Sequence, residues 1–411
     1  MTPCGIEALN VYCGLARIAV PALFAGRGLN QDRLANLMMH QRSLGLPFED
    51  AITNAVNAAR PIVDALTPEE KERIEILVTS TESGIDYSKS VSSYVHHHLG
   101  LSRRCRIIEA KQACYAATGA VQMGVAYVAS GISPGAKVLV IATDISLADG
   151  RAEYVEPVTG AGAAAVLVSD NPRVLTVDLG AFGNYGFETL DSGRPTPTLE
   201  IADVDGSLFA YLDCLKNAFL AYCDRVDGTD FTSTFDYLVM HTPFAGLVKA
   251  GHRKMMRELA RATPMDIEQD FTRRVLPSLT YGSNVGNLCS GSVYLALASL
   301  IDAVKPDTGY RVGLYSYGSG CCSEFFSGLI DQESTAALAD MQIARHLAAR
   351  CDLTFDEYER LLEETSGCLV PRKEADVEIG RWSGFLDARI NGRSLLALKA
   401  VRNYHREYEW V

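Results

Sequence analysis

The sequence repeats one order of predicted elements twice along its 411 residues. Each half contains an apolar strand, a helix rich in small residues, a second apolar strand, a turn and a third strand. These elements are expected at residues 74–84, 116–125, 136–145 and 160–169, and again at residues 235–244, 285–301, 310–320 and 324–330. Apolar strands between helices are typical of sheets that are covered on both faces. We therefore expect a layered α/β fold with two pseudo-symmetric halves and a functional site where the halves meet.

The two halves are expected to span residues 1–170 and residues 171–411. No linker marks a separate domain toward the C-terminal end. Residues 341–351 follow a helical pattern there. A strand pair is expected around Asn391 and Gly392, because this dipeptide favours a tight hairpin turn.

The composition excludes several classes of protein. The hydrophobic fraction of 48% is sufficient for a large core, but no apolar run reaches the roughly 18 to 20 residues of a membrane span. The N-terminal residues lack the basic segment and the apolar stretch of a signal peptide. The net charge of −12 argues against broad nucleic-acid binding. We expect a soluble cytoplasmic protein with neither a membrane nor a nucleic-acid partner.

The cysteines and histidines do not form an obvious metal site. Eleven cysteines, an odd number, are scattered from Cys4 to Cys368, and their spacing matches neither a disulfide framework nor a metal knuckle. The adjacent histidines His96–His98 cannot converge on one ion unaided, because successive residues of a helix point about 100° apart. We expect a reducing compartment, no metal, and a surface or interface helix at these histidines.

Cys114 is the candidate nucleophile. It lies between a predicted strand at residues 105–109 and a small-residue helix that begins at Ala116. The free amide groups and the dipole at a helix N-terminus favour a thiolate, so we expect a lowered thiol pKa. Such a thiol suits covalent catalysis, whereas the alternative is a buried inert cysteine.

Three polar residues stand at the ends of other predicted elements. Glu82 ends a strand and is a candidate general acid or base, because partial burial raises the pKa of a carboxyl group. His241 ends a second strand, just before Pro243, and is expected to face a cavity. Asn287 stands at a helix start and offers an amide donor. The alternatives are a capping or surface glutamate, a core histidine and an N-cap asparagine.

Two loops are expected near these residues. The glycine-rich turn Ser316–Gly320 follows a strand, but it lacks the lysine and the glycine spacing of a phosphate loop. The segment Tyr154–Gly162 is expected at the pocket wall. Within it Tyr154 is assigned to substrate binding, and Glu156 is a weaker candidate whose alternative is a solvated loop charge.

Five motifs, in this order, carry a family resemblance: TESGIDYSKS, EAKQACYAATGA, DYLVMHTPF, VGNLCSGS and YSYGSG. Together they resemble the 3-hydroxy-3-methylglutaryl synthase family of the thiolase superfamily over essentially the whole chain. The opening GIEALNVYCG, the segment RLANLMM and the run KQACY are similar to the branch that acts on acyl-carrier-protein thioesters in polyketide assembly lines. The resemblance implies a five-layered αβαβα fold and a homodimer.

The resemblance also implies a reaction. Cys114 takes an acetyl group from the phosphopantetheine arm of a donor carrier protein, so that no permanently bound cofactor is required. Glu82 removes a methyl proton, and the carbanion attacks the β-ketone of an acceptor acyl chain on another carrier protein. Water then cleaves the Cys114 thioester. The product is a β-hydroxy-β-carboxymethyl acyl thioester, which later steps turn into a β-methyl branch.

Further residues gain roles from the same resemblance. His241 and Asn287 hold the β-carbonyl oxygen of the acceptor. The turn that carries Ser316 and Gly318 comes close to the nucleophile, and the backbone N–H groups of Ser316 and Cys114 form the oxyanion hole for the thioester carbonyl.

The acceptor and donor carriers are acidic, and one basic cluster is expected to contact them. It comprises Lys249, His252, Arg253, Lys254 and Arg257. The alternative is an ordinary solvated helix face.

Three other functions stay open. A coenzyme A-dependent enzyme of mevalonate synthesis would share every catalytic residue. A ketoacyl synthase of the initiating type would lack a carboxylate like Glu82. A non-catalytic docking subunit would carry a degenerate site.

Overall fold

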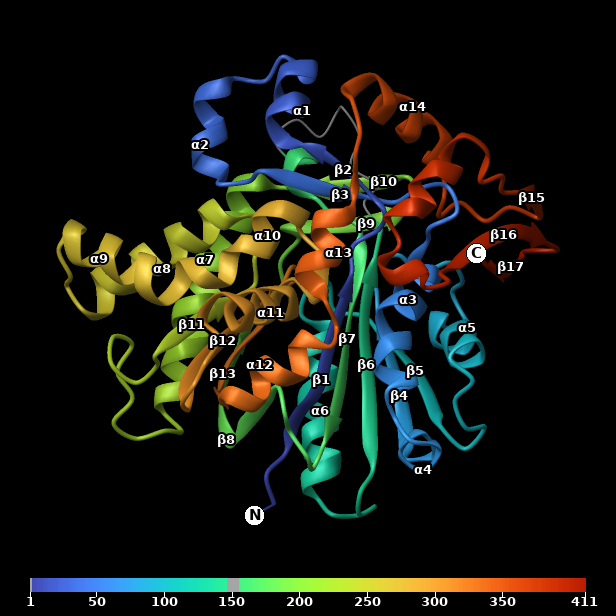
Figure 1. The fold of residues 1–411 in the computed structure, drawn as a ribbon. Coiled ribbons are helices and arrows are strands. Elements are labelled where there is room, and N and C mark those ends of the chain that lie inside the picture. Colours follow the sequence, from blue (N-terminus) through green and yellow to red (C-terminus); the bar gives the residue numbers. More distant parts are fainter. Residues whose placement is uncertain (1, 146–154) are drawn as a thin grey trace.

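The computed structural model describes residues 2–145 and 155–411, in which nine strands form one sheet (Figure 1). The strand order is β11-β12-β13-β8-β1-β7-β6-β4-β5. In chain order the strands are β1 (Gly5–Tyr12), β4 (Ile74–Ser80), β5 (Arg106–Ala110), β6 (Lys137–Asp144), β7 (Gly162–Ser169), β8 (Leu175–Gly186), β11 (Tyr237–Met240), β12 (Tyr310–Gly318) and β13 (Cys322–Ile330).

The two halves of this sheet have the same pairing pattern. In the first half β4 pairs with β6 in parallel, and β6, β7 and β1 then pair antiparallel. In the second half β11 pairs with β12 in parallel, and β12, β13 and β8 pair antiparallel. The predicted pseudo-symmetry is therefore confirmed. The halves join through a short antiparallel pairing of β1 with β8.

Helices form three layers around the two halves of the sheet. The outer layers are α3 (Ala51–Asp64) with α5 (Val91–His98) on the first half and α7 (Val204–Cys223) with α8 (Ala245–Leu259) on the second, at opposite sides of Figure 1. The central layer consists of α6 (Ala116–Ala129) and α11 (Ser292–Val304), which share one apolar core with strands of both halves. The expected αβαβα order is thus confirmed.

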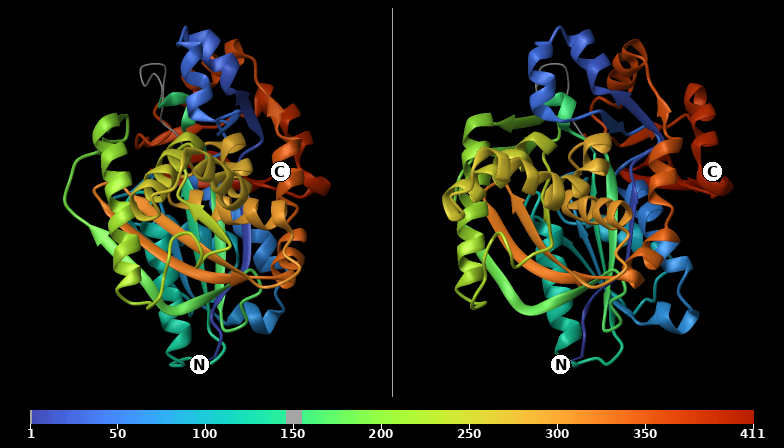
Figure 2. Two further views of the ribbon diagram at one scale, coloured as in Figure 1. Left: turned by 90° about the vertical axis from the view of Figure 1, so that its left-hand side faces the viewer. Right: turned by 60° about the vertical axis from the view of Figure 1, so that its left-hand side comes forward.

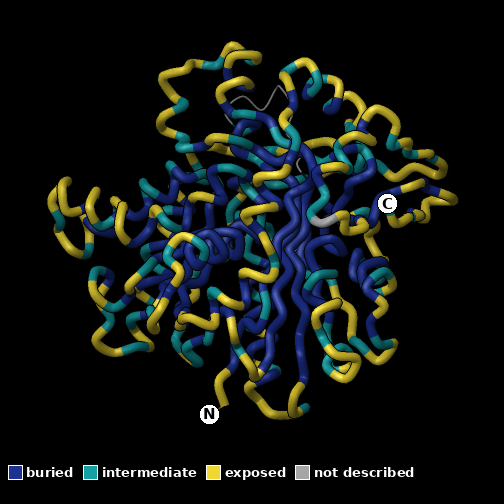
Figure 3. The backbone as a smooth tube through the Cα atoms, viewed as in Figure 1, coloured by how far each residue is buried: buried dark blue, intermediate teal, exposed yellow. Residues whose placement is uncertain are grey.

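Burial explains why these segments take these forms. All residues of β6 and β7 are buried, as expected for strands that helices cover on both faces. The first ten residues of α11 are buried on every side, which is typical of a helix inside a core. The central strands accordingly appear dark blue in Figure 3.

Shorter elements complete the fold. They are β2 (Ala16–Ala19), α1 (Val20–Arg27), α2 (Leu34–Leu37), β3 (Gln41–Leu44), α4 (Pro68–Glu72), β9 (Ser192–Thr196), β10 (Leu199–Ala202), α9 (Pro264–Asp270) and α10 (Thr280–Val285). The C-terminal part adds α12 (Gln332–Ala339), α13 (Ile343–Ala349), β14 (Cys351–Asp352), α14 (Phe355–Thr365), β15 (Glu374–Asp376), β16 (Leu396–Arg402) and β17 (His405–Trp410). Helices α1, α2 and α14 lie at one end of the molecule in both figures (Figures 1 and 2).

The predicted hairpin turn at Asn391 and Gly392 is wrong. These residues belong to a short 3-10 turn, Ile390–Gly392. The hairpin turn lies between β16 and β17, where Asn403 and Tyr404 have φ angles of 49° and 66°. Two successive left-handed residues match the twist of the flanking strands, so a turn without glycine closes this hairpin.

The C-terminal hairpin packs on the first half of the chain. Arg406 Nη1 donates to Asp50 Oδ2 at 2.7 Å, and Asp50 in turn caps α3. The predicted helix within residues 341–351 is confirmed as α13, and His96–His98 end α5 as expected. None of the helices in residues 2–145 and 155–411 combines the length and apolar character that crossing a membrane requires.

Candidate active site

Cys114 lies in the turn between β5 and α6, one residue before the N-cap residue Tyr115. Ala113 precedes it with a φ of 44°, a left-handed conformation that is rare for alanine. Such outliers gather at functional sites. The turn therefore presents the thiol at the N-terminal end of the central helix α6, as the sequence predicts.

The carboxyl group of Glu82 lies directly beside this thiol. Glu82 follows the C-terminal end of β4, and the Cys114 S–H donates to its Oε1 with an S–O distance of 3.4 Å. Burial raises the pKa of Glu82, and the charge of Arg194 and a hydrogen bond from the Cys114 thiol partly oppose this effect. A carboxylate with a raised pKa, in contact with a thiol, has the properties of a general base.

The predicted lowering of the Cys114 pKa is wrong. A hydrogen bond from the Cys289 thiol lowers it, but burial and the Glu82 and Asp144 carboxylates outweigh that effect and raise the pKa of Cys114 to about 11. Two nearby negative charges disfavour a third. The resting site is therefore a neutral thiol next to a carboxylate.

This electrostatic arrangement gives a testable pH dependence. The thiolate is the reactive form of cysteine, so the rate at which iodoacetamide alkylates Cys114 should rise steadily with pH and reach no plateau below about pH 10, given a thiol pKa of about 11. Replacing Glu82 by glutamine removes a charge that raises this pKa. The variant should therefore react faster than the wild type at pH 8. Peptide mass spectrometry of Cys114 measures both rates, and a plateau near neutral pH in the wild type would contradict this account.

Asp144, at the end of β6, is a residue of the site that the sequence did not single out. Its Oδ1 accepts from the backbone N–H of Glu82 at 2.8 Å and from Ser83 Oγ at 2.9 Å. Its Oδ2 is buried and has no hydrogen-bond partner among the described residues. Burial, followed by the charge of Glu82, raises the pKa of Asp144. The sequence did offer one sign of this role, because Asp144 is a charged residue at the end of an apolar strand.

Arg194 of β9 holds the same loop from the other side. Its Nη1 donates to the Glu82 backbone oxygen at 3.0 Å and to Ser83 Oγ at 3.1 Å, and its Nη2 pairs with Glu200 at 2.9 Å. Asp144 and Arg194 thus fix the Glu82 backbone and leave its side chain free to face Cys114.

Asn287 and Cys289 approach the thiol from the second half of the chain. The Asn287 backbone N–H donates to the Val158 oxygen at 2.8 Å, and its Oδ1 accepts from the Cys289 N–H at 3.0 Å and from Ser292 Oγ at 2.9 Å. The side-chain oxygen is therefore engaged by two donors of the turn that follows it. The Nδ2 group donates to none of the described residues, so it is available as the predicted amide donor.

The sulfur of Cys289 completes a compact cluster. One ligand atom each of Glu82, Cys114 and Cys289 lies within 4.8 Å of the others. This is the one group of three such residues in the described parts of the chain that could hold a metal ion, and two thiols with a carboxylate suit Zn²⁺. The expected absence of a metal stays a prediction.

His241 directly follows β11 and is buried. Its backbone N–H donates to the Tyr315 oxygen at 2.7 Å, and Tyr211 donates to its backbone oxygen at 2.9 Å. Its Nδ1 is buried and without a partner among the described residues. Burial lowers the pKa of His241 to about 3, so the imidazole is neutral and carries one N–H donor.

The glycine-rich turn meets the nucleophile turn through backbone contacts. A Cβ atom added to Gly318 would lie 2.5 Å from the Tyr115 nitrogen and 2.6 Å from the Gln112 oxygen. Only glycine allows β12 to approach the Cys114 turn this closely. Ser316, two residues earlier, is fully buried, and its Oγ has no partner among the described residues.

Replacing Gly318 by alanine should therefore displace Cys114. We expect a loss of stability of about 1 to 3 kcal/mol from overpacking and a fall in turnover of roughly 10²-fold for a displacement of about 1 Å. Gly309, just before the same strand, has open space around its Cα. Gly309→Ala is therefore the matched control, and it should leave stability and turnover unchanged. Thermal unfolding and acetyl loading measure the two effects, and equal behaviour of the two variants would contradict the role of this contact.

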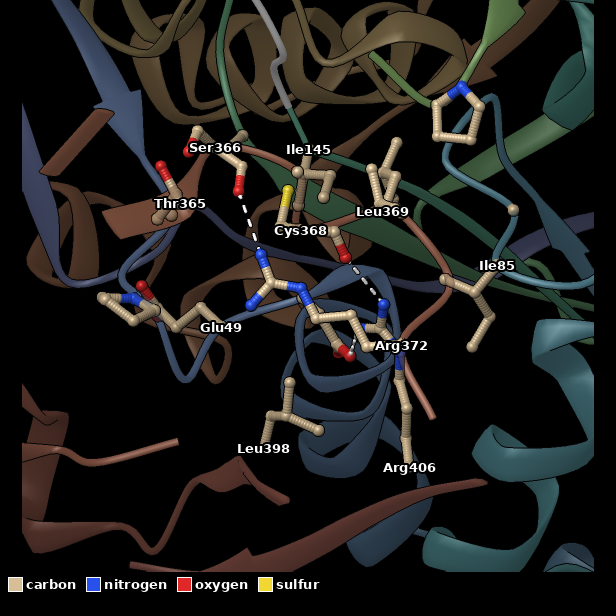
Figure 4. Close-up of a pocket in the computed structure, with 18 of the residues that line it drawn as sticks. Glu49, Ile85, Ile145, Thr365, Ser366, Cys368, Leu369, Arg372, Leu398 and Arg406 are labelled. Carbon is tan, nitrogen blue, oxygen red and sulfur yellow. Dashed lines mark hydrogen bonds and ion pairs between the residues drawn. The ribbon is translucent and has the colours of Figure 1, made fainter. Parts of the chain in front are cut away.

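A cavity of about 840 Å³ opens on the Glu82 side of the site (Figure 4). Its walls are the loop from Glu82 to Ser88, the turn at 194–197 and the segment 364–378. Arg372 and Arg406 lie close to each other among the lining residues in Figure 4, and Arg406 Nη2 donates to the Cys368 oxygen at 2.7 Å. A volume of this size is typical of small-molecule sites. Cys114 itself keeps partial exposure and is not sealed in the core.

Two loop predictions have different outcomes. Tyr154 lies outside the described residues. Glu156 is fully buried and is not a solvated charge, because it pairs with Arg27 at 2.9 Å and accepts from the Tyr358 hydroxyl at 2.8 Å. It stabilises the contact between α1 and α14.

The basic cluster on α8 is largely neutralised. Lys249 pairs with Glu268 at 2.7 Å, and Lys254 pairs with Glu258 at 2.8 Å. His252 does not belong to the surface: it is buried and its Nε2 lies 2.7 Å from Asp270 Oδ2. Arg253 and Arg257 are exposed.

Comparison with known proteins agrees with this geometry. Residues 50–172 match the family described as hydroxymethylglutaryl-coenzyme A synthase N terminal, and residues 254–373 match its C-terminal counterpart. The sequence is 44% identical to the polyketide biosynthesis 3-hydroxy-3-methylglutaryl-ACP synthase PksG of Bacillus subtilis, over 100% of both chains. It is 33% identical to the hydroxymethylglutaryl-CoA synthase of Enterococcus faecalis, over 88% of this chain and 92% of the relative.

A solved structure extends this likeness to three dimensions. The HMG synthase of the curacin biosynthetic pathway, in complex with its apo donor-ACP, superposes with a TM-score of 0.95 and 47% identity over 100% of both chains.

Proposed function

This chain belongs to the hydroxymethylglutaryl-CoA synthase family, and we propose that it acts on polyketide chains held by acyl-carrier proteins. As a member of that family it is an acyl-transferring enzyme. Its identity of 44% with PksG, against 33% with a coenzyme A-dependent relative, supports the carrier-protein branch.

In the proposed first step the Cys114 sulfur attacks the acetyl thioester of a donor carrier. The carrier's phosphopantetheine thiol leaves and takes up a proton, and Cys114 holds the acetyl group as a new thioester. Glu82, whose Oε1 is 3.4 Å from this sulfur, accepts the thiol proton and passes it to the leaving phosphopantetheine thiolate, so that its carboxylate is restored for the next step. Backbone N–H groups of Ser316 and Cys114 stabilise the carbonyl oxygen.

Glu82 then removes a proton from the acetyl methyl group. The resulting carbanion attacks the β-ketone of the acceptor chain, whose oxygen His241 and Asn287 hold, and Glu82 returns its proton to the new alkoxide. His241 suits this task because burial keeps its imidazole neutral, with one N–H to donate and a pKa of about 3. Water finally cleaves the Cys114 thioester and releases the branched product.

The contact between Cys114 and Glu82 is the observation that carries this proposal. A ketoacyl synthase needs no carboxylate there, and a docking subunit needs no paired acid and thiol. The test is to incubate the protein with acetyl-carrier protein and, separately, with acetyl-coenzyme A, and to follow the mass of Cys114. Preferential loading from the carrier is expected. Equal or better loading from coenzyme A would favour the mevalonate enzyme.

The carrier is proposed to dock near Arg253 and Arg257 on α8, the two exposed arginines of the basic cluster. Lys249 and Lys254 contribute less, because acidic neighbours pair with them. Charge reversal at Arg253 should slow loading from the carrier and leave loading from a pantetheine thioester unchanged.

A homodimer is proposed through the free edge of β5. Ile107 and Ile108 on this strand are 41% and 52% exposed, although they are large and apolar. An exposed apolar edge strand is normally covered by another part of the protein or by a partner. In the proposed dimer the second copy packs against β5, close to the Cys114 turn. Analytical ultracentrifugation should give twice the mass of the monomer. The Ile108→Asp variant should give a mass closer to that of the monomer.

The phosphopantetheine arm is proposed as substrate carrier rather than resident cofactor, in a cytoplasmic enzyme. Eleven free cysteines support a reducing compartment. The division into residues 1–170 and 171–411 stays a proposal, which the turn between β7 and β8 supports.

A further inference from the structure

Cys289 is the one member of the thiol–carboxylate cluster that the proposed reaction leaves without a task. Its sulfur lies within 4.8 Å of both the Cys114 sulfur and a Glu82 carboxylate oxygen. The backbone at Cys289 has a φ of 48°, and the Asn287 side chain holds its N–H at 3.0 Å. A left-handed residue held by a second residue of the site indicates that its position is functional.

The reaction creates a need for a second hydrogen-bond donor. Before loading, the Glu82 carboxylate accepts from the Cys114 S–H at 3.4 Å. Acetylation replaces that hydrogen with an acyl carbon, so the donor disappears at the moment when Glu82 must turn to the acetyl methyl group. A base without a fixed orientation loses rate, because proton transfer requires the reacting atoms to be held in line.

Among the described residues, the other polar neighbours of Glu82 contact its backbone and do not replace this donor. Arg194 contacts the Glu82 backbone oxygen, and Asp144 accepts from the Glu82 backbone N–H. Burial raises the pKa of Glu82, Arg194 opposes it through its charge, and the side-chain hydrogen bonds that also oppose it come from Cys114 and Cys289. Cys289 is therefore the thiol that still has its hydrogen after loading.

We propose that Cys289 is a positioning residue, whose S–H holds the Glu82 carboxylate toward the acetyl methyl group once Cys114 is acylated. This inference rests on the proposed function. It gives Cys289 a task in the proton-transfer step, which can be measured on the loaded enzyme, separately from loading.

The test measures proton transfer on the loaded enzyme without an acceptor. Full-length protein is acetylated from acetyl-carrier protein in deuterated buffer, and peptide mass spectrometry follows deuterium entering the acetyl group on Cys114 between pH 6 and 9. Two variants are compared, Cys289→Ala and Cys289→Ser, and both substituted residues must adopt the same left-handed backbone conformation. They differ in whether a hydrogen-bond donor remains.

We expect Cys289→Ala to load acetyl more slowly than the wild type, because the variant loses the hydrogen bond that lowers the pKa of the Cys114 thiol. Once loaded, it should exchange the methyl hydrogens about tenfold more slowly than the loaded wild type, with a shifted pH profile. Cys289→Ser should recover most of the exchange rate. Wild-type exchange in Cys289→Ala, or an equal loss in both variants, would overturn the inference. Failure of the wild type to load or exchange would instead overturn the proposed function. Thermal unfolding of both variants identifies any loss that is due to misfolding.

Discussion

Replacing Cys114 by alanine is expected to abolish acetyl loading and, with it, all product formation. In the proposed reaction the Cys114 sulfur is the atom that forms the thioester, and it lies at the start of α6. The residual rate should fall to the uncatalysed level, a loss of at least about 10⁶-fold if the enzyme accelerates the reaction by an ordinary factor. Intact mass after incubation with acetyl-carrier protein measures loading directly.

The matched control for this variant is Cys105→Ala. Cys105 immediately precedes β5, the same strand that leads to the nucleophile, and its sulfur donates to the neighbouring Arg106 oxygen at 3.5 Å. It should load acetyl at the wild-type rate. Continued acetylation of the Cys114→Ala protein at one defined cysteine would show that the nucleophile has been wrongly identified.

Replacing Glu82 by glutamine should separate loading from condensation. The amide keeps the size of the side chain and leaves the backbone bonds to Asp144 and Arg194 in place, but it cannot accept a proton. Carbon–carbon bond formation should therefore fall by about 10² to 10⁴-fold, the usual contribution of a general base. Acetyl should still accumulate on Cys114, because a thiolate can form without Glu82 when its pKa is lowered by the loss of that charge.

Product analysis and Cys114 mass together measure the two steps. Glu75→Gln is the control, because Glu75 lies at the opposite end of the same strand, β4, where it accepts from Ser133 and Tyr127. That variant should condense normally. A Glu82→Gln protein that condenses at the wild-type rate would exclude Glu82 as the base.

The sequence was sufficient for the frame of the fold and for the main chemical pair. Strands such as β6 and β7 are buried along their whole length, and continuous apolar runs reveal such strands directly. Glu82 and Cys114 were predicted to belong to one site from their positions at the ends of elements and from the family resemblance of the motifs around them. The structure brings the two side chains into contact at 3.4 Å.

The features that the sequence did not reveal depend on distances between segments far apart in the chain. The pKa of the Cys114 thiol is raised because the thiol is buried and because Glu82 and Asp144 lie near it, whereas a helix N-terminus alone would lower this pKa. Cys289 gains significance only from its approach to Glu82. The hairpin turn lies at Asn403 and Tyr404, two non-glycine residues with positive φ angles, and a turn of that kind has no glycine to mark it in the sequence.

The position of β1 in the sheet affects how the chain must assemble. β1 precedes both of its partner strands in the chain: it pairs with β7 on one side and with β8 on the other, so that Gly5 lies opposite Ser169 and Thr176. A nascent chain therefore carries an apolar strand without neighbours until the whole first half has left the ribosome. Long-range pairing of this kind slows folding and leaves hydrophobic surface exposed, which favours aggregation. Production in a foreign host should therefore benefit from slow synthesis at low temperature or from added chaperones.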